Sequence, residues 1–191
     1  MERSIIFAGF GGQGILFAGK VLARAAMNED REVLWIPSYG PEMRGGTASC
    51  TVIIASEPIG SPIVDQADAA VLLNPPSHAK FASQVAPGGL LVVNETLVGD
   101  ASGRTDITEL RIPCTRLAKD AGDDSLVSVV ALGALVGYLQ LVRAASVRNA
   151  IRDTVGAKRL EVLAADLAAF DVGHRVGARS RPQRGRVTVP L

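Results

Sequence analysis

The sequence predicts an α/β protein with a single three-layer αβα domain of Rossmann-like type, a mostly parallel sheet and a helical C-terminal part. Short apolar runs alternate with helical patterns in the N-terminal half, as is typical of such folds. Only 4% of the 191 residues are aromatic and 48% are hydrophobic, so the core must consist mainly of Ala, Val, Leu and Ile. These side chains suit a parallel sheet buried on both faces. The chain shows neither an internal repeat nor a linker.

The N-terminal elements form a strand–helix–strand unit. Residues 4–8 are an apolar run that ends at glycines, and residues 14–27 have apolar side chains at helical spacing. Residues 32–36 form the next expected strand, which Pro37 should end. A further strand is expected at residues 47–55 without an obvious crossover helix before it, so a mixed sheet stays open.

The rest of the chain is expected to complete the sheet and then to become helical. The expected strands are 68–74, 90–95 and 106–113, and the expected helices are 75–85, 126–142, 147–155 and 159–170. The 126–142 helix is apolar on most sides, which predicts a place in the core or in an interface and leaves dimerisation of an isolated chain open. Residues 175–191 contain five arginines and no acid, so the domain is assigned to 1–174 and a flexible tail to 175–191.

Composition argues against several classes of protein. The net charge of +1 falls to −4 without the five tail arginines, which is not a nucleic-acid-binding balance. No run of about 18 apolar residues could span a bilayer. Cys50 and Cys114 form no CxxC motif, so we expect no metal or cluster bound by this chain alone, and reduced thiols in a cytoplasmic protein. His78 and His174 lack partner groups and are expected to be ordinary surface or core residues.

A glycine-rich turn lies between the first expected strand and helix, and its sequence formally matches GxGxxG. Glycines permit positive φ and close approach of a ligand, and a helix N-terminus offers free N–H groups to an anion. The alternative is that the glycines serve only close packing of strand against helix. The candidate ligand or interface residues in this first loop are Gly9, Gly11, Gly12, Gln13 and Gly14.

Binding of a dinucleotide by this turn is disfavoured. NAD-binding folds expect an acidic residue at the end of the second strand to hold the ribose hydroxyls. Here that strand ends Trp35-Ile36-Pro37-Ser38, with no acid. An autonomous nucleotide-binding oxidoreductase is therefore an alternative hypothesis only.

A second unusual loop follows the second expected strand and reads SYGPEMRGG from Ser38. Arg44 can grip a carboxylate or phosphate with two hydrogen bonds, and Glu42 could orient it. The two loops are expected to face one another, because loops after parallel strands meet at the carboxyl edge of the sheet. The alternative is a surface turn with a local Glu–Arg pair. The candidate residues of this second loop are Ser38, Tyr39, Gly40, Glu42, Arg44, Gly45 and Gly46.

In combination, the two loops resemble those of the gamma subunit of 2-oxoacid:ferredoxin oxidoreductases. The resemblance lies in GFGGQG, PSYGPEMRGGT, Ile59-Gly60-Ser61-Pro62 and the stretch 67–74, and it covers about residues 5–173. This family includes the pyruvate, 2-oxoglutarate, branched-chain 2-ketoacid and indolepyruvate enzymes. Which 2-oxoacid would be used stays open, because the substrate pocket is expected largely on partner chains.

The resemblance implies a subunit that completes a shared site without holding the redox groups. Such enzymes decarboxylate a 2-oxoacid on thiamine diphosphate, form acyl-coenzyme A and reduce ferredoxin. Thiamine diphosphate and Mg²⁺ are expected in alpha and beta partners, and [4Fe–4S] clusters in a beta or ferredoxin-like delta partner. The gamma chain is expected to help close the site and admit coenzyme A. No catalytic residue is assigned to it; Asn74, Asn94 and Ser128 are candidate supporting residues.

Two positions depart from the family pattern. The family often has Asn where Ser128 stands in the long helix, and it tends to Asn where Asp166 stands near the end. Both changes keep a small polar residue, so they leave the fold unaffected, and a divergent substrate class is one explanation. A scaffold protein whose basic tail contacts an acidic partner is the remaining alternative.

Overall fold

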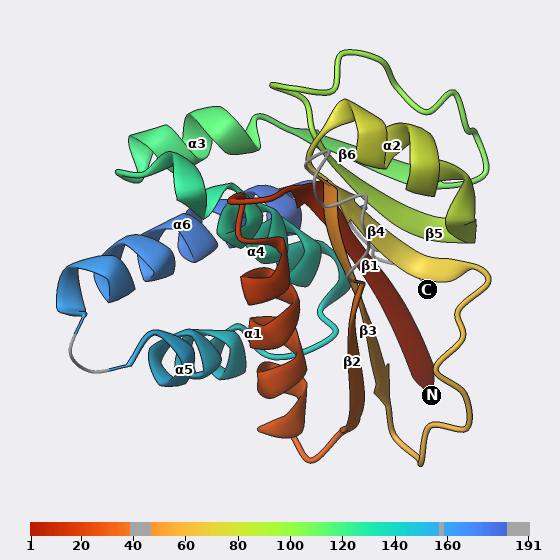
Figure 1. Ribbon diagram of the computed structural model, residues 1–191, viewed down its shortest axis with the longest axis horizontal. Coiled ribbons are helices and arrows are strands. Elements are labelled where there is room, and N and C mark those ends of the chain that lie inside the picture. Colours follow the sequence, from red (N-terminus) through yellow and green to blue (C-terminus); the bar gives the residue numbers. More distant parts are fainter. Residues whose placement is uncertain (39–46, 157–158, 183–191) are drawn as a thin grey trace, which may run out of the picture.

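The computed structural model of the chain describes residues 1–38, 47–156 and 159–182. These residues form a six-stranded sheet with the order β2-β3-β1-β4-β5-β6 (Figure 1). Strand β3 runs antiparallel to β1 and β2, whereas β1, β4, β5 and β6 are parallel, so the expected mostly parallel sheet is confirmed. The strands are β1 (Glu2–Phe10), β2 (Glu32–Ser38), β3 (Thr47–Ala55), β4 (Ala67–Leu72), β5 (Val85–Asn94) and β6 (Thr108–Ile112).

Strand β3 lies between β1 and β2 and determines where the two predicted loops leave the sheet. Phe10 at the end of β1 is opposite Thr47, and Ser38 at the end of β2 is opposite Ser49. The described residues on either side of the second loop therefore lie at the same sheet edge as the first loop. The strand–helix–strand unit expected from the sequence forms as β1, α1 and β2, but β3 lies between its two strands.

The helices cover the two faces of the sheet unequally (Figure 1). One face packs against α1 (Ile15–Met27), α4 (Val127–Leu139) and the elements around them. The other face packs against the short helix α2 and the turn η2 that follows it. The remaining elements are α2 (Pro75–Phe81), η2 (Ala82–Gln84), α3 (Cys114–Asp120), η3 (Asp124–Leu126), α5 (Ala144–Val155) and α6 (Leu160–Arg179).

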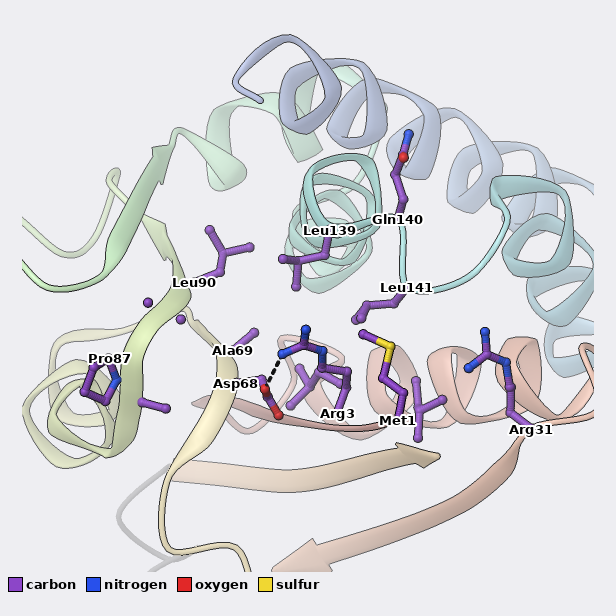
Figure 2. Close-up of a pocket in the computed structure, with 15 residues that line it drawn as sticks. Met1, Arg3, Arg31, Asp68, Ala69, Pro87, Leu90, Leu139, Gln140 and Leu141 are labelled. Atoms are coloured by element: carbon purple, nitrogen blue, oxygen red, sulfur yellow. Dashed lines mark hydrogen bonds and ion pairs between the residues drawn. The ribbon is translucent and has the colours of Figure 1, made fainter. Parts of the chain in front are cut away.

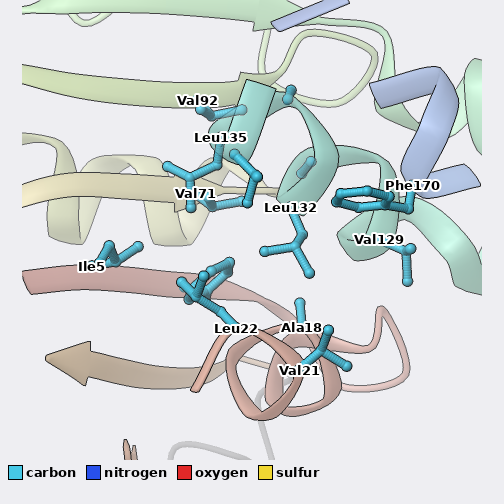
Figure 3. Packing of buried hydrophobic residues seen from close by; sticks show 14 of the residues in the cluster. Ile5, Ala18, Val21, Leu22, Val71, Val92, Val129, Leu132, Leu135 and Phe170 are labelled. Atoms are coloured by element: carbon cyan, nitrogen blue, oxygen red, sulfur yellow. The ribbon is translucent and has the colours of Figure 1, made fainter. Parts of the chain in front are cut away.

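The buried side chains of β1, β4 and β5 alternate between two hydrophobic clusters. Ile5 and Phe7 belong to the large cluster beneath α1 and α4, and Ile6 and Ala8 belong to the small cluster beneath α2. Figure 3 shows Leu132 of α4 among side chains of β1, β4 and α1 in the large cluster. Helix α4 is buried almost completely by elements of the same chain. It is therefore a core helix, and its apolar character gives no reason to expect dimerisation.

Several boundaries differ from those expected. Pro37 lies within β2 rather than ending it, which an edge strand tolerates because one side needs no ladder hydrogen bonds. The helix that begins at Pro75 ends at Phe81 and continues only as the η2 turn, and β5 begins at Val85.

Helix α6 continues to Arg179, so residues 175–179 are helical and do not belong to a tail. Gly177 is buried there against α4, which explains why the helix extends so far. Residues 183–191 lie outside the described part. No helix among the described residues is long and apolar enough to cross a membrane.

Candidate functional site

The first loop is a tight turn that its own residues hold together. Gly12 has φ 91° and Gly14, the N-cap of α1, has φ 74°, a left-handed region that favours glycine. The Phe10 N–H donates to Gln13 Oε1 at 2.7 Å, and the Gln13 N–H donates to Phe10 O at 3.2 Å. Gln13 therefore shapes the loop with its side chain.

Two glycines of this loop are closely packed against other atoms, and two are exposed. A Cβ at Gly9 would lie 2.6 Å from Gln13 Oε1, and one at Gly14 would lie 2.6 Å from Ser128 Oγ. A Cβ at Gly11 or Gly12 would meet no atom within 4 Å, and both residues are exposed. Packing thus explains Gly9 and Gly14, while Gly11 and Gly12 present bare backbone at the carboxyl edge.

A cleft of about 380 Å³ lies beside this loop, between the start of α1 and the first half of α6. We call it the α1–α6 cleft. It is lined by Gly12 and Gly14 of the loop, apolar residues of α1, α4 and α6, and polar residues from four segments: Asp123, Ser125, Ser128, Thr154, Arg159 and Asp166.

Two of the polar side chains in the cleft, those of Ser128 and Asp166, are buried and have no partner among the residues that the structure describes. The Ser128 side chain on α4 is fully buried, and its Oγ has no hydrogen-bond partner among the described residues. Asp166 on α6 is only 5% exposed. Burial, and then the nearby Asp123 carboxylate, raises the pKa of Asp166 to about 6. Among the described residues no cation pairs with it.

Asp123 is a second negative charge at this cleft. The Ser125 N–H donates to Asp123 Oδ1 at 2.7 Å, and this backbone bond, with the Ser125 side chain, holds the pKa of Asp123 below its usual range. At neutral pH both carboxylates are therefore mostly ionised.

The other predicted site residues have different places. The Asn94 amide donates to Thr115 Oγ1 at 2.9 Å and accepts from the Thr115 N–H at 3.3 Å, so Asn94 joins β5 to α3. Asn74 caps α2 by accepting from the Ser77 N–H at 2.8 Å. Ser38 ends β2 at the edge shared with the first loop. The other predicted residues of the second loop, Tyr39, Gly40, Glu42, Arg44, Gly45 and Gly46, lie outside the described residues.

Sequence reasoning named Ser128 as a supporting residue but did not assign Asp166 to the site. The spacing contained the signal, because Asp166 stands three residues before Ala169 and four before Phe170, which are both fully buried. An acid on the buried stripe of a helix is a candidate for function. The structure also shows that Ser128 and Asp166, the two departures from the family pattern, line the same cleft.

A second cavity, of about 320 Å³, lies at the opposite edge of the sheet, where β1 and β4 begin. Figure 2 shows that Met1, Leu139 and Leu141 line it together with Arg3 and Asp68. Arg3 Nη1 lies 2.6 Å from Asp68 Oδ1, so these two charges neutralise each other. This cavity lies at the sheet edge opposite to the first loop and to Ser38 and Thr47, so it is a weaker candidate.

The two cysteines lie in the core of the fold. Cys50 on β3 and Cys114 on α3 are both buried, and burial raises the pKa of each to about 12. They are therefore neutral thiols in the folded chain. Within the described residues no group of three or more His, Cys, Asp or Glu side chains could hold a metal ion.

Relatives of this chain are subunits of oxidoreductases. Subunit VorA of a ketoisovalerate oxidoreductase from Methanothermobacter marburgensis is 40% identical over 158 residues, 82% of this chain and 33% of that protein. Subunit KorC of a 2-oxoglutarate synthase from Methanocaldococcus jannaschii is 37% identical over 179 residues, 92% of this chain and 94% of that protein. The chain thus spans about a third of VorA and almost all of KorC.

Solved structures show the same fold. The gamma subunit of a keto/oxoacid ferredoxin oxidoreductase from Geobacter sulfurreducens PCA superposes with a TM-score of 0.81 at 28% identity, covering 93% of this chain and 99% of that one. A 2-oxoglutarate:ferredoxin oxidoreductase from Magnetococcus marinus, solved with 2-oxoglutarate, coenzyme A and succinyl-CoA bound, gives 0.84 at 26% identity, covering 93% of this chain and 31% of that one.

The sequence pattern of the family "Pyruvate ferredoxin/flavodoxin oxidoreductase" matches residues 4–176, which include most of β1, all of β2 to β6 and nearly all of α6. This chain therefore belongs to the pyruvate ferredoxin/flavodoxin oxidoreductase family.

Proposed function

We propose that this chain is the gamma subunit of a cytoplasmic 2-oxoacid:ferredoxin oxidoreductase that converts a 2-oxoacid to acyl-coenzyme A by oxidative decarboxylation. The observation that favours this role is the bare backbone of Gly11 and Gly12 at the carboxyl edge of the sheet. In open α/β sheets ligands bind at this edge. The described ends of the second loop, Ser38 and Thr47, lie at the same edge, so both loops can contribute to one site.

The groups that carry out decarboxylation and electron transfer would be held by partner chains. Thiamine diphosphate and Mg²⁺ would be held by alpha and beta subunits, and [4Fe–4S] clusters by a beta or ferredoxin-like delta subunit. When bound there, thiamine diphosphate supplies the electron sink for decarboxylation. The presence of only two cysteines in this chain, with no CxxC motif, supports this division.

This chain would then supply one wall of a site shared between subunits. The backbone at Gly11 and Gly12 allows a ligand or a partner loop to approach closely, and the closed wall helps to exclude water and to position coenzyme A. Tyr39, Glu42 and Arg44 are proposed to act from the second loop. The chain alone is expected to have no turnover.

The experiment that tests this function is anaerobic reconstitution with the partner subunits, followed by assay of ferredoxin reduction that depends on a 2-oxoacid and coenzyme A. Gly11→Ala is the informative variant, because its new methyl group meets open space and leaves this chain folded. We expect kcat/KM for coenzyme A to fall about tenfold or more, since a small displacement at a shared site is costly. Gly99→Ala, also at an exposed position where the new methyl group meets no atom within 4 Å, is the matched control and should match wild type.

If Gly11→Ala has the same kinetics as the wild type, the first loop does not take part in the shared site. Failure of the wild-type chain to join any thiamine-diphosphate-binding partner would contradict the subunit role itself. Micromolar binding of NAD(H) or FAD by the isolated chain would instead favour the autonomous nucleotide-binding alternative.

A further inference from the structure

We propose that the α1–α6 cleft is the docking site for one basic side chain, an arginine or a lysine, of a partner subunit. This inference rests on the proposed function, since it needs a partner chain. It concerns the cleft beside the open Gly11–Gly12 rim, which shares Gly12 with that rim, and it names the chemistry that would hold the subunits together there.

The first support is the Ser128 hydroxyl at the bottom of the cleft. Ser128 Oγ is buried directly against Gly14 and has no hydrogen-bond partner among the described residues. Buried hydroxyls are nearly always hydrogen-bonded, and an unmade bond is costly. The hydroxyl lines the cleft, so a donor that enters the cleft can satisfy it.

The second support is the charge of the cleft. Asp166 is buried and unpaired in the described chain, and the carboxylate of Asp123 lines the same cleft. A buried carboxylate without a counter-charge destabilises the folded chain. A guanidinium or ammonium group would neutralise this charge and donate hydrogen bonds to both carboxylate and hydroxyl oxygens.

These carboxylates also argue against an anion in the cleft. The N-terminus of α1 beside Gly14 would favour a phosphate if it acted alone. Two negative charges lining the same space oppose that binding. Arg159 lines the cleft as well, but it is exposed and forms no ion pair with either carboxylate in the described residues. The counter-charge is therefore expected from outside the part of the chain that the structure describes, and we assign it to a partner subunit.

The rim of the cleft has the character of a surface that a protein covers. Val162 lines the cleft and is 48% exposed, and Leu160, two residues before it on α6, is 71% exposed. Phe17 of α1 forms part of the opposite wall. Apolar walls suit the aliphatic stem of an arginine or lysine, whose charged end would reach Asp166. An apolar rim around a desolvated ion pair is typical of a protein interface.

The test measures the affinity of this chain for its purified partner subunits under anaerobic conditions. Asp166→Asn keeps the size of the side chain and removes its charge, and we expect the dissociation constant to rise about tenfold or more. Ser128→Ala should raise it about threefold. Asp65→Asn removes the same charge from an exposed residue outside the cleft and is the control, with no change expected.

Melting temperatures of the isolated variants separate docking from folding. Asp166→Asn is expected to melt at a higher temperature than wild type at pH 7, so weaker association cannot come from unfolding. Equal affinity of Asp166→Asn and wild type for the partners would overturn this inference while leaving the subunit role intact. A second outcome would also overturn the inference. If the changes in melting temperature of Asp166→Asn and Arg159→Gln do not add in the double variant, Arg159 is the partner of the Asp166 carboxylate.

Discussion

The buried carboxylate of Asp166 lowers the free energy of unfolding of the isolated chain. Its carboxyl group lies on the buried stripe of α6, close enough to Asp123 for the two charges to repel each other. Nothing in the described chain compensates for the loss of solvation. Residues that reduce stability in this way are concentrated at sites of binding and catalysis, where another molecule supplies the missing interaction.

The raised pKa of Asp166 makes a specific prediction about pH. Because its pKa is about 6 in the folded chain and 3.8 in the unfolded one, the folded state holds the proton more tightly between these values. The free energy of unfolding therefore falls as pH rises from about 4 to about 6, by at most about 3 kcal/mol from this group. Urea unfolding of wild type and Asp166→Asn at several pH values measures the effect.

Asp166→Asn should be more stable than wild type by about 1–3 kcal/mol at pH 7, and the advantage should vanish near pH 4. The difference between the two proteins isolates this group from the other carboxylates, including Asp123, whose pKa is lowered. A constant difference across the whole range would mean that Asp166 does not titrate in this way.

The sequence predicted single residues best where backbone geometry restricts the choice. The glycines of the first loop were recognisable because only glycine suits positive φ, as at Gly12 and Gly14. Which of these glycines are packed and which are open could not be recognised from the sequence. Gly14, for example, packs against Ser128, which is more than a hundred residues away along the chain. The unpaired state of Ser128 and Asp166 likewise arises only when α4 and α6 come together.

At the scale of elements, α4 and α6 pack unusually closely. Gly133 and Gly137 of α4 face backbone atoms of α6, and Gly173 and Gly177 of α6 face backbone atoms of α4. A side chain at any of these positions would run into the backbone of the other helix. This contact fixes the position of Ser128 on α4 relative to Asp166 on α6, and it thereby shapes the α1–α6 cleft.

Gly173→Ala tests the closeness of this contact. Its new methyl group would run into the Val130 carbonyl oxygen, which cannot move aside as a flexible side chain could. We expect a net loss of about 1–3 kcal/mol in the free energy of unfolding, even though alanine is the better helix former by about 1 kcal/mol. Ala168→Gly, exposed on the same helix, measures the propensity effect alone. Stabilisation by Gly173→Ala would show that the helices are further apart.

The elements that the sequence misplaced are those decided by tertiary contacts. Hydrophobic periodicity located β3, α1 and α4 to within a few residues, because each is strongly patterned. It ended α6 at Phe170, since the glycines and basic residues beyond it resemble a helix end. Packing of Gly173 and Gly177 against α4 continues the helix instead. The position of β3 between β1 and β2 also depends on long-range pairing.

At the scale of the whole molecule, one hydrophobic cluster joins the sheet to α1, α3, α4, α5 and α6. Cys50 on β3 and Cys114 on α3 both belong to it, although they lie in different parts of the fold. If the cluster opens as a unit, the two thiols report on the same event. They are suitable probes because both are buried and protonated, with pKa values raised to about 12.

We expect both cysteines of the native chain to resist a thiol reagent at pH 8 and to react together, at one rate limited by unfolding. Burial both excludes the reagent and suppresses the thiolate, so reaction requires exposure of the core. Mass spectrometry over time should show unlabelled and doubly labelled chains with little of the singly labelled form. Cys50→Ala and Cys114→Ala variants assign each site. Early labelling of Cys114 alone would instead mean that α3 opens separately from the sheet, and that the element before Asp123 can move while the core that positions Ser128 stays closed.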